Sequence, residues 1–210
     1  MKDSIKNFLL SIFKNIGSKS QQTALSAITY GSSSIITQAI MVIYMIIVAK
    51  WLGAEKYGYI AASYASISLS AFLFNWGFNQ FLMKSGSTSS KPEELGGRVI
   101  FIKAILGLVW GGILFFVLKM IRPDLYIEYI LILTILEIWL DSQFGTLIAI
   151  LLLKNRAILA SVLLVSSRLF RLLSLLILVS YSSESIFLVL LLRLLTSLII
   201  FMISAGVCMD

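Results

Sequence analysis

Residues 126–179 read YIEYILILTILEIWLDSQFGTLIAILLLKNRAILASVLLVSSRLFRLLSLLILV, and this stretch decides the fold. It contains two apolar segments, each long enough for a helix that crosses a bilayer, joined by a short basic turn. Charged residues interrupt both segments: Glu137 and Asp141 in the first, Arg168 and Arg171 in the second. Because one such charge costs about 2.5–3.5 kcal/mol at the middle of a bilayer, we expect these side chains to face one another or a wet cavity.

The composition of the whole chain points to the same environment. Of its 210 residues, 59% are hydrophobic and 13% are charged, and the mean hydropathy is +0.98. Apolar runs of about twenty residues, the length that a transmembrane helix needs, recur along the chain. The sequence therefore predicts an all-α, polytopic transmembrane bundle. Its six expected spans are residues 24–49, 59–83, 99–118, 126–153, 158–179 and 186–207.

The charge balance and the cysteine count exclude several classes of protein. The net charge is +7, but most basic residues lie between the spans or near the N-terminus, where anionic lipid headgroups explain them better than nucleic acid does. The chain has no histidine and a single cysteine, Cys208. We therefore expect no disulfide, metal or cofactor, and no binding of nucleic acid.

Lysine and arginine are distributed unevenly between the two sides of the predicted bundle. With the N-terminus inside, the cytoplasmic residues are Lys2, Lys6, Lys14, Lys19, Lys84, Lys91, Arg98, Lys103, Lys154 and Arg156, and the outer ones are Lys50, Lys56, Lys119 and Arg122. Ten against four predicts a cytoplasmic N-terminus. Arg98 and Lys103 enter this count as topology determinants that flank the third span; contact with a substrate phosphate is the alternative.

Residues 1–22 have a different pattern from the rest of the chain. Apolar residues recur at helical spacing among lysines, which is typical of an amphipathic helix lying at the membrane surface. A frayed basic tail is the alternative. Residues 23–210 form the predicted six-helix transmembrane lobe.

Polar side chains recur on one face of each of the first two spans. They are Tyr30, Ser34 and Thr37 on the first span, and Tyr64, Ser68, Asn75 and Asn79 on the second. Spacings of three and four residues place such side chains on one side of a helix. Single polar residues often serve as hydrogen-bonding contacts between helices. Continuous stripes on two neighbouring spans favour a water-filled groove instead.

The third span contains Gly107 and Gly111, four residues apart. Small residues at this spacing allow two helix backbones to approach closely. We expect this pair to be a packing site and assign it no ligand.

The charged residues of the last three spans share helix faces and depths. Glu137 and Asp141 are four residues apart, Arg168 and Arg171 are three apart, and Arg193 is expected level with Arg171. Two readings remain open. The first is a structural ion-pair network that fixes helix register. The second is a cavity whose three arginines receive an anionic headgroup while the carboxylates hold them in place, because a guanidinium meets phosphate oxygens with two hydrogen bonds.

A family resemblance comes from the first two spans. Leu52-Gly53 and Tyr57-Gly58 lie between them, and the second ends with the run from Asn75 to Gln80, NWGFNQ. This arrangement resembles the N-terminal half of polysaccharide (O-antigen, Wzx-type) flippases of the multidrug/oligosaccharidyl-lipid/polysaccharide exporter superfamily. The resemblance implies a multi-pass transporter of the bacterial inner membrane, not an enzyme. Such a transporter moves undecaprenyl-diphosphate-linked oligosaccharide through a cationic cavity by alternating access, for lipopolysaccharide and other surface polysaccharides.

The predicted number of spans departs from that family, whose members have two lobes. Six spans make one lobe, and we expect the chain to be a first lobe from a truncated or interrupted reading frame, with a second lobe as its partner. A homodimer is the alternative. Two other functions also stay open: an integral membrane glycan polymerase or ligase, and a drug exporter of the same superfamily.

Overall fold

The computed structural model describes residues 18–75, 77–88, 91–121, 123, 127–181 and 185–209, and it contains only helices within these ranges. The helices are α2 (Ser18–Asn75), α3 (Phe78–Gly86), α4 (Pro92–Ile121), α5 (Glu128–Leu153), α6 (Ala157–Tyr181) and α7 (Ile186–Met209). The predicted all-α fold is confirmed. Of the interfacial segment predicted over residues 1–22, residues 1–17 lie outside the described residues, and Ser18 already belongs to α2.

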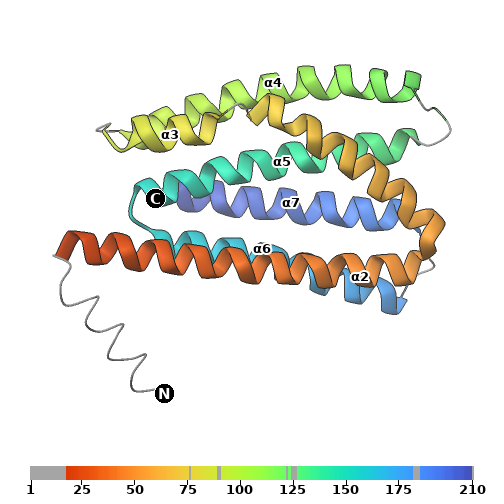
Figure 1. Ribbon diagram of the computed structural model, residues 1–210, viewed down its shortest axis with the longest axis horizontal. Coiled ribbons are helices and arrows are strands. Elements are labelled where there is room, and N and C mark those ends of the chain that lie inside the picture. Colours follow the sequence, from red (N-terminus) through yellow and green to blue (C-terminus); the bar gives the residue numbers. More distant parts are fainter. Residues whose placement is uncertain are drawn as a thin grey trace.

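The first helix, α2, contains two limbs. It is 58 residues long, far more than the about 20 residues that cross a bilayer. At Gly53 the backbone has φ 79° and ψ 167°, a conformation that glycine adopts because it has no Cβ. The chain reverses there, and the second limb runs back toward the opposite end of the bundle (Figure 1). The expected connection at residues 51–58 is therefore helical apart from one residue.

The length and composition of the helices suit them to cross a membrane. Five helices, α2, α4, α5, α6 and α7, are long and apolar enough to do so, and α2 contributes two limbs. Large apolar side chains such as Leu69, Phe116 and Met120 are exposed, as expected where lipid takes the place of water. The protein is a membrane-embedded helical bundle, as predicted.

The second predicted span is interrupted, contrary to expectation. α2 ends at Asn75 and α3 begins at Phe78, with Gly77 between them in the left-handed conformation at φ 70°. The expected continuous helix over residues 59–83 is therefore wrong. A residue with φ in this range ends a right-handed helix, and glycine is the residue that adopts it at least cost.

α5 is the most enclosed helix of the bundle. Of the 18 most apolar consecutive residues of α5, 61% are buried. The corresponding share in each of the other four spanning helices is 17–28%. It packs against α4 on one side and α7 on another, while α6 packs against α2 (Figure 1). Polar side chains carried by α5 are therefore shielded from lipid by its neighbours.

Glycines of α4 allow its close approach to α5. A Cβ on Gly107 would overlap the indole ring of Trp139, and a Cβ on Gly111 would lie 2.7 Å from the Cγ2 of Ile135. The packing role predicted for this pair is confirmed. The close contact fixes the position of α4 beside the polar residues of α5.

The turn between α5 and α6 ties three helix ends together. The Nζ of Lys154 donates to the backbone oxygen of Cys208, at 3.0 Å, and lies 3.4 Å from the Oε1 of Glu93. Asn155 has a positive φ of 57°, which lets the chain turn within a few residues. The start of α4 and the end of α7 are thus held at the same end of the bundle (Figure 1).

Candidate functional site

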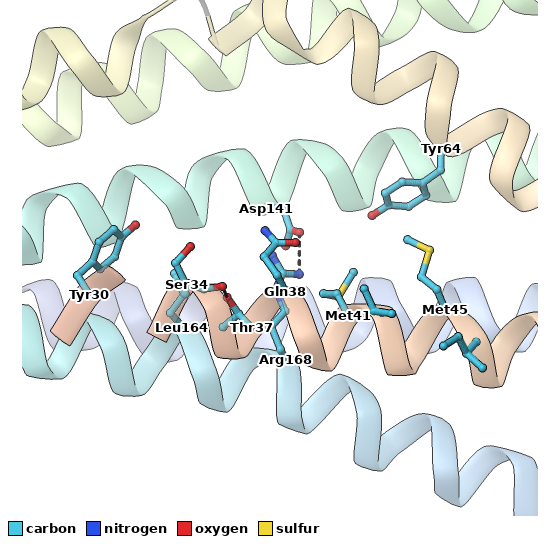
Figure 2. Close-up of a pocket in the computed structure, with 12 residues that line it drawn as sticks. Tyr30, Ser34, Thr37, Gln38, Met41, Met45, Tyr64, Asp141, Leu164 and Arg168 are labelled. Carbon is cyan, nitrogen blue, oxygen red and sulfur yellow. Dashed lines mark hydrogen bonds and ion pairs between the residues drawn. The ribbon is translucent and has the colours of Figure 1, made fainter. Parts of the chain in front are cut away.

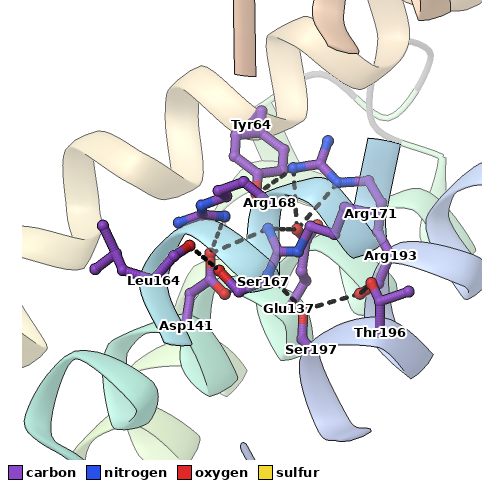
Figure 3. Close-up of polar contacts among 10 residues, drawn as sticks. All are labelled: Tyr64, Glu137, Asp141, Leu164, Ser167, Arg168, Arg171, Arg193, Thr196 and Ser197. Carbon is purple, nitrogen blue, oxygen red and sulfur yellow. Dashed lines mark hydrogen bonds and ion pairs between the residues drawn. The ribbon is translucent and has the colours of Figure 1, made fainter. Parts of the chain in front are cut away.

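The charged residues of the last three helices meet in one network (Figure 3). An Nη1 of Arg171 lies 3.2 Å from the Oε1 of Glu137, and the Nη2 of Arg193 lies 2.9 Å from the same oxygen. The Nη1 of Arg168 lies 3.3 Å from the Oδ2 of Asp141, which also pairs with Arg171. The structure therefore brings together all five charges that the sequence placed at matching depths.

The network has an enclosed part and an accessible part. The side chains of Glu137, Arg171 and Arg193 are 0%, 3% and 4% exposed. Those of Arg168 and Asp141 are 23% and 25% exposed. The Arg168–Asp141 pair is therefore the most accessible part of the network.

Three further side chains complete the network, and sequence reasoning did not assign them to it. The hydroxyl of Tyr64 accepts a hydrogen bond of 2.7 Å from Arg193, whose guanidinium carbon lies 4.5 Å from the centre of the Tyr64 ring and 5.2 Å from that of Tyr44. The hydroxyl of Ser197 accepts from Arg171 at 2.6 Å. The cation–π contacts hold Arg193 between the two limbs of α2 and α5. The sequence did contain a signal for one of them. Tyr44 is seven residues after Thr37, two helical turns, and so lies on the polar face of the first span.

A groove of about 570 Å³ opens beside the accessible pair (Figure 2). It is lined by Tyr30, Ser34, Thr37, Gln38, Met41, Val42, Met45, Ile46, Tyr64, Asp141, Leu164 and Arg168. The polar stripe of the first limb of α2 forms one wall, and Arg168 and Asp141 belong to another. Of the residues expected in a polar groove, Tyr30, Ser34, Thr37 and Tyr64 lie here.

The other expected groove residues line two further cavities. Ser68 lies in a cavity of about 260 Å³ together with Tyr44, Tyr64 and Arg193. Asn75 and Asn79 line a cavity of about 440 Å³. The single groove expected from the sequence is therefore three adjoining cavities, which share Tyr64 or Asp141 as wall residues. Ser68 lies about two turns of α2 before Asn75 and lines the cavity with Tyr44 and Arg193, whereas Asn75 and Asn79 flank the break at Gly77 and line the cavity with Ser142.

Lys103 is not a flanking residue at the membrane surface. It is 1% exposed, and its Nζ donates to the Oδ1 of Asn79 at 3.3 Å, the backbone oxygen of Ser142 at 2.8 Å and the Oγ1 of Thr146 at 2.8 Å. The topology role predicted for it is wrong, because α4 starts at Pro92, about two turns before the predicted span, and Lys103 lies well inside the helix. Without Lys103 the count of basic residues still stands at nine against four.

The signal for this burial was present in the sequence. Lys103 is four residues before Gly107, which is four before Gly111, so all three lie on one helix face. That face packs against α5.

Protein-family models, curated proteins and solved structures give no match to this chain. The function must therefore be argued from the geometry of the site. Within the described ranges, no group of three or more His, Cys, Asp or Glu side chains could hold a metal ion. The groove beside Arg168 presents a partly exposed guanidinium, an amide, hydroxyl groups and apolar side chains to a ligand.

Proposed function

We propose that this protein is a component of a flippase that moves undecaprenyl-diphosphate-linked oligosaccharide across the bacterial inner membrane for surface polysaccharide biosynthesis. The observation that supports it is the position of Arg168 at the wall of the membrane-embedded groove. In this proposal the substrate enters from one leaflet, and alternating access of the groove releases it at the other. The N-terminus is cytoplasmic, and a second lobe or a second copy of the chain completes the cavity.

The charge of the site supports an anionic ligand. Three arginines and two carboxylates leave one positive charge, and Arg168 is the arginine with the greatest exposure among them. A guanidinium keeps its charge in an apolar environment and binds phosphate oxygens with two parallel hydrogen bonds. A diphosphate that links a lipid to a sugar carries two negative charges, and the surplus positive charge at Arg168 would offset one of them.

The lining of the groove supports a ligand that is part polar and part apolar. Ser34, Thr37 and Gln38 offer hydroxyl and amide groups, whereas Met41 and Leu164 offer apolar surface. The volume of about 570 Å³ falls in the range of ligand cavities, about 300–1,000 Å³. A phosphate headgroup joined to a lipid chain fits this mixture better than a wholly polar solute does.

In this proposal Arg171 and Arg193 have a different role from Arg168. They hold Glu137 and Asp141 in place from the enclosed side of the network, so that Asp141 in turn fixes the guanidinium of Arg168. In this arrangement the two carboxylates orient the arginine side chains, and Arg168 contacts the headgroup.

The alternatives receive less support. A drug exporter that takes cations needs a negative or aromatic wall. Tyr30, Tyr64 and Asp141 supply part of such a wall, but Arg168 beside Asp141 cancels its negative charge. A polymerase or ligase requires catalytic groups on an extracytoplasmic loop, and the connections between successive helices are short; the one between α4 and α5 spans residues 122–127.

A binding experiment tests the proposal. The full chain in lipid nanodiscs would be mixed with undecaprenyl diphosphate or with undecaprenol, and bound lipid measured by native mass spectrometry. We expect the diphosphate to bind, the alcohol to bind at least about tenfold more weakly, and Arg168→Gln to remove this preference. Arg156→Gln, at an exposed arginine in the turn between α5 and α6, is the matched control and should leave it unchanged. Equal binding of the two lipids would reject the proposal.

A further inference from the structure

The cavity of about 440 Å³ lies where α2 ends and α3 begins, against α5. It is lined by Asn75, Gly77, Asn79, Gln80, Ile138, Asp141, Ser142 and Gly145. The left-handed turn at Gly77 interrupts the helix between Asn75 and Asn79, and both side chains face the same cavity. The pocket at the helix break therefore has three amide side chains and one hydroxyl in its lining.

Lys103 determines the orientation of the Asn79 amide. An ammonium group donates hydrogen bonds and cannot accept them, so the atom of Asn79 that faces it must be the oxygen. The hydroxyl of Thr146 also lies 3.0 Å from this oxygen. The amide nitrogen consequently points the other way, toward Gly145, where an added Cβ would lie 3.5 Å from it. Gly145 lines the pocket, so Asn79 presents an NH₂ group there.

Asn75 presents the same kind of group. Its Oδ1 accepts a hydrogen bond of 2.6 Å from the hydroxyl of Ser142, which leaves the amide nitrogen as the donor that Asn75 offers. Asp141 supplies carboxylate oxygens, which accept hydrogen bonds, and the amide of Gln80 supplies both kinds of group. One small cavity thus offers both donors and acceptors.

We infer that this pocket is a subsite for the hydroxyl groups of a neutral sugar. Each sugar hydroxyl donates one hydrogen bond and accepts others, so it matches a wall that offers amide donors beside carboxylate acceptors. An anion is disfavoured, because the one charged residue among those lining the pocket is Asp141. The inference rests on the proposed function and names the part of the substrate that this pocket takes.

The position of the pocket agrees with such a substrate. Asp141 belongs to the walls of both this pocket and the groove that contains Arg168. A sugar linked to a diphosphate could therefore place its phosphate at Arg168 and its hydroxyls against Asn75 and Asn79 at the same time.

The test uses the full chain in nanodiscs and free glucose, galactose, mannose and N-acetylglucosamine, each followed by saturation-transfer-difference NMR. We expect at least one sugar to give signals with the unchanged protein. Gly145→Ala places a methyl group at ordinary contact distance from the Asn79 nitrogen, so the fold tolerates it while the donor is covered. Loss of that hydrogen bond should weaken sugar binding by about fivefold. Gly206→Ala, which meets open space on α7, is the matched control and should change nothing.

The outcomes separate this inference from the proposed function. Sugar signals that fall in Gly145→Ala, with undecaprenyl diphosphate binding unchanged in the same variant, support the inference. The absence of signals for all four sugars, or equal signals in Gly145→Ala and Gly206→Ala, overturns it. If sugars bind in this pattern while undecaprenyl diphosphate shows no preference over undecaprenol, the sugar subsite stands and the flippase proposal falls.

Discussion

Arg168 and Arg171 are three residues apart on the same face of α6, yet their surroundings differ. Arg171 is 3% exposed and pairs with both Glu137 and Asp141, whereas Arg168 is 23% exposed and pairs with Asp141 at the wall of the groove. One turn of helix thus separates a charge that is part of the protein interior from a charge that a ligand can reach. The two arginines should respond differently to the same substitution.

Replacing each arginine by glutamine tests this difference. Arg171→Gln leaves Glu137 with one fewer buried counter-charge, so we expect the free energy of unfolding to fall by about 3–5 kcal/mol. Arg168→Gln removes a partly exposed pair, and we expect a loss of about 1 kcal/mol or less. Unfolding of the purified protein by sodium dodecyl sulfate in mixed micelles measures both. Similar losses for the two variants would contradict the division of the network.

Exchanging the charges of Asp141 and Arg168 should not restore stability. The double variant Asp141→Arg with Arg168→Asp keeps an opposite pair, but it places the new arginine beside Arg171, which the structure pairs with Asp141. Like charges at that distance repel, so we expect the double variant to stay well below the unchanged protein in the same unfolding measurement. Full recovery would mean that Asp141 depends on Arg168 alone.

Lys103 should control the order of α3. Its ammonium connects α4 to Asn79 of α3 and to Ser142 and Thr146 of α5. Lys103→Met keeps the apolar length of the side chain but removes three hydrogen bonds from a charged donor, each contributing about 1.5–3 kcal/mol. Asn79 then keeps only the hydrogen bond from Thr146. Hydrogen–deuterium exchange should become faster in α3 and stay unchanged in α6. Unchanged exchange in α3 would show that its position does not depend on Lys103.

The contact between α4 and α5 should tolerate alanine at one glycine and not at another. Gly107→Ala forces a methyl group into the Trp139 indole, which we expect to cost about 1–3 kcal/mol through overpacking. Gly112→Ala is the matched control, because a Cβ there meets open space and alanine favours the helix. The midpoints of thermal unfolding in detergent compare the two. Equal midpoints would show that α4 can shift away from α5 at little cost.

Much of the architecture follows from local properties of the chain. Hydropathy alone predicted the all-α membrane bundle, because a helix in lipid must be apolar along its length wherever it is placed. The cost of an isolated charge in lipid predicted that Glu137 and Asp141 would meet Arg168 and Arg171. Gly107 and Gly111 likewise predicted a close helix contact. Because glycine has no Cβ, a second helix can pack directly against the backbone at these two positions.

The remaining features depend on how the helices are rotated and packed against one another. Sequence spacing gives the face of a helix on which a residue lies, but not which neighbour covers that face. Tertiary packing therefore decided that Lys103 is buried against Asn79, that Arg171 is enclosed while Arg168 reaches the groove, and that Ser68 lines a different cavity from Asn75 and Asn79. Hydrophobicity along the chain determined that this protein lies in a membrane; the placement of α5 among its neighbours decided which of its polar groups a ligand can reach.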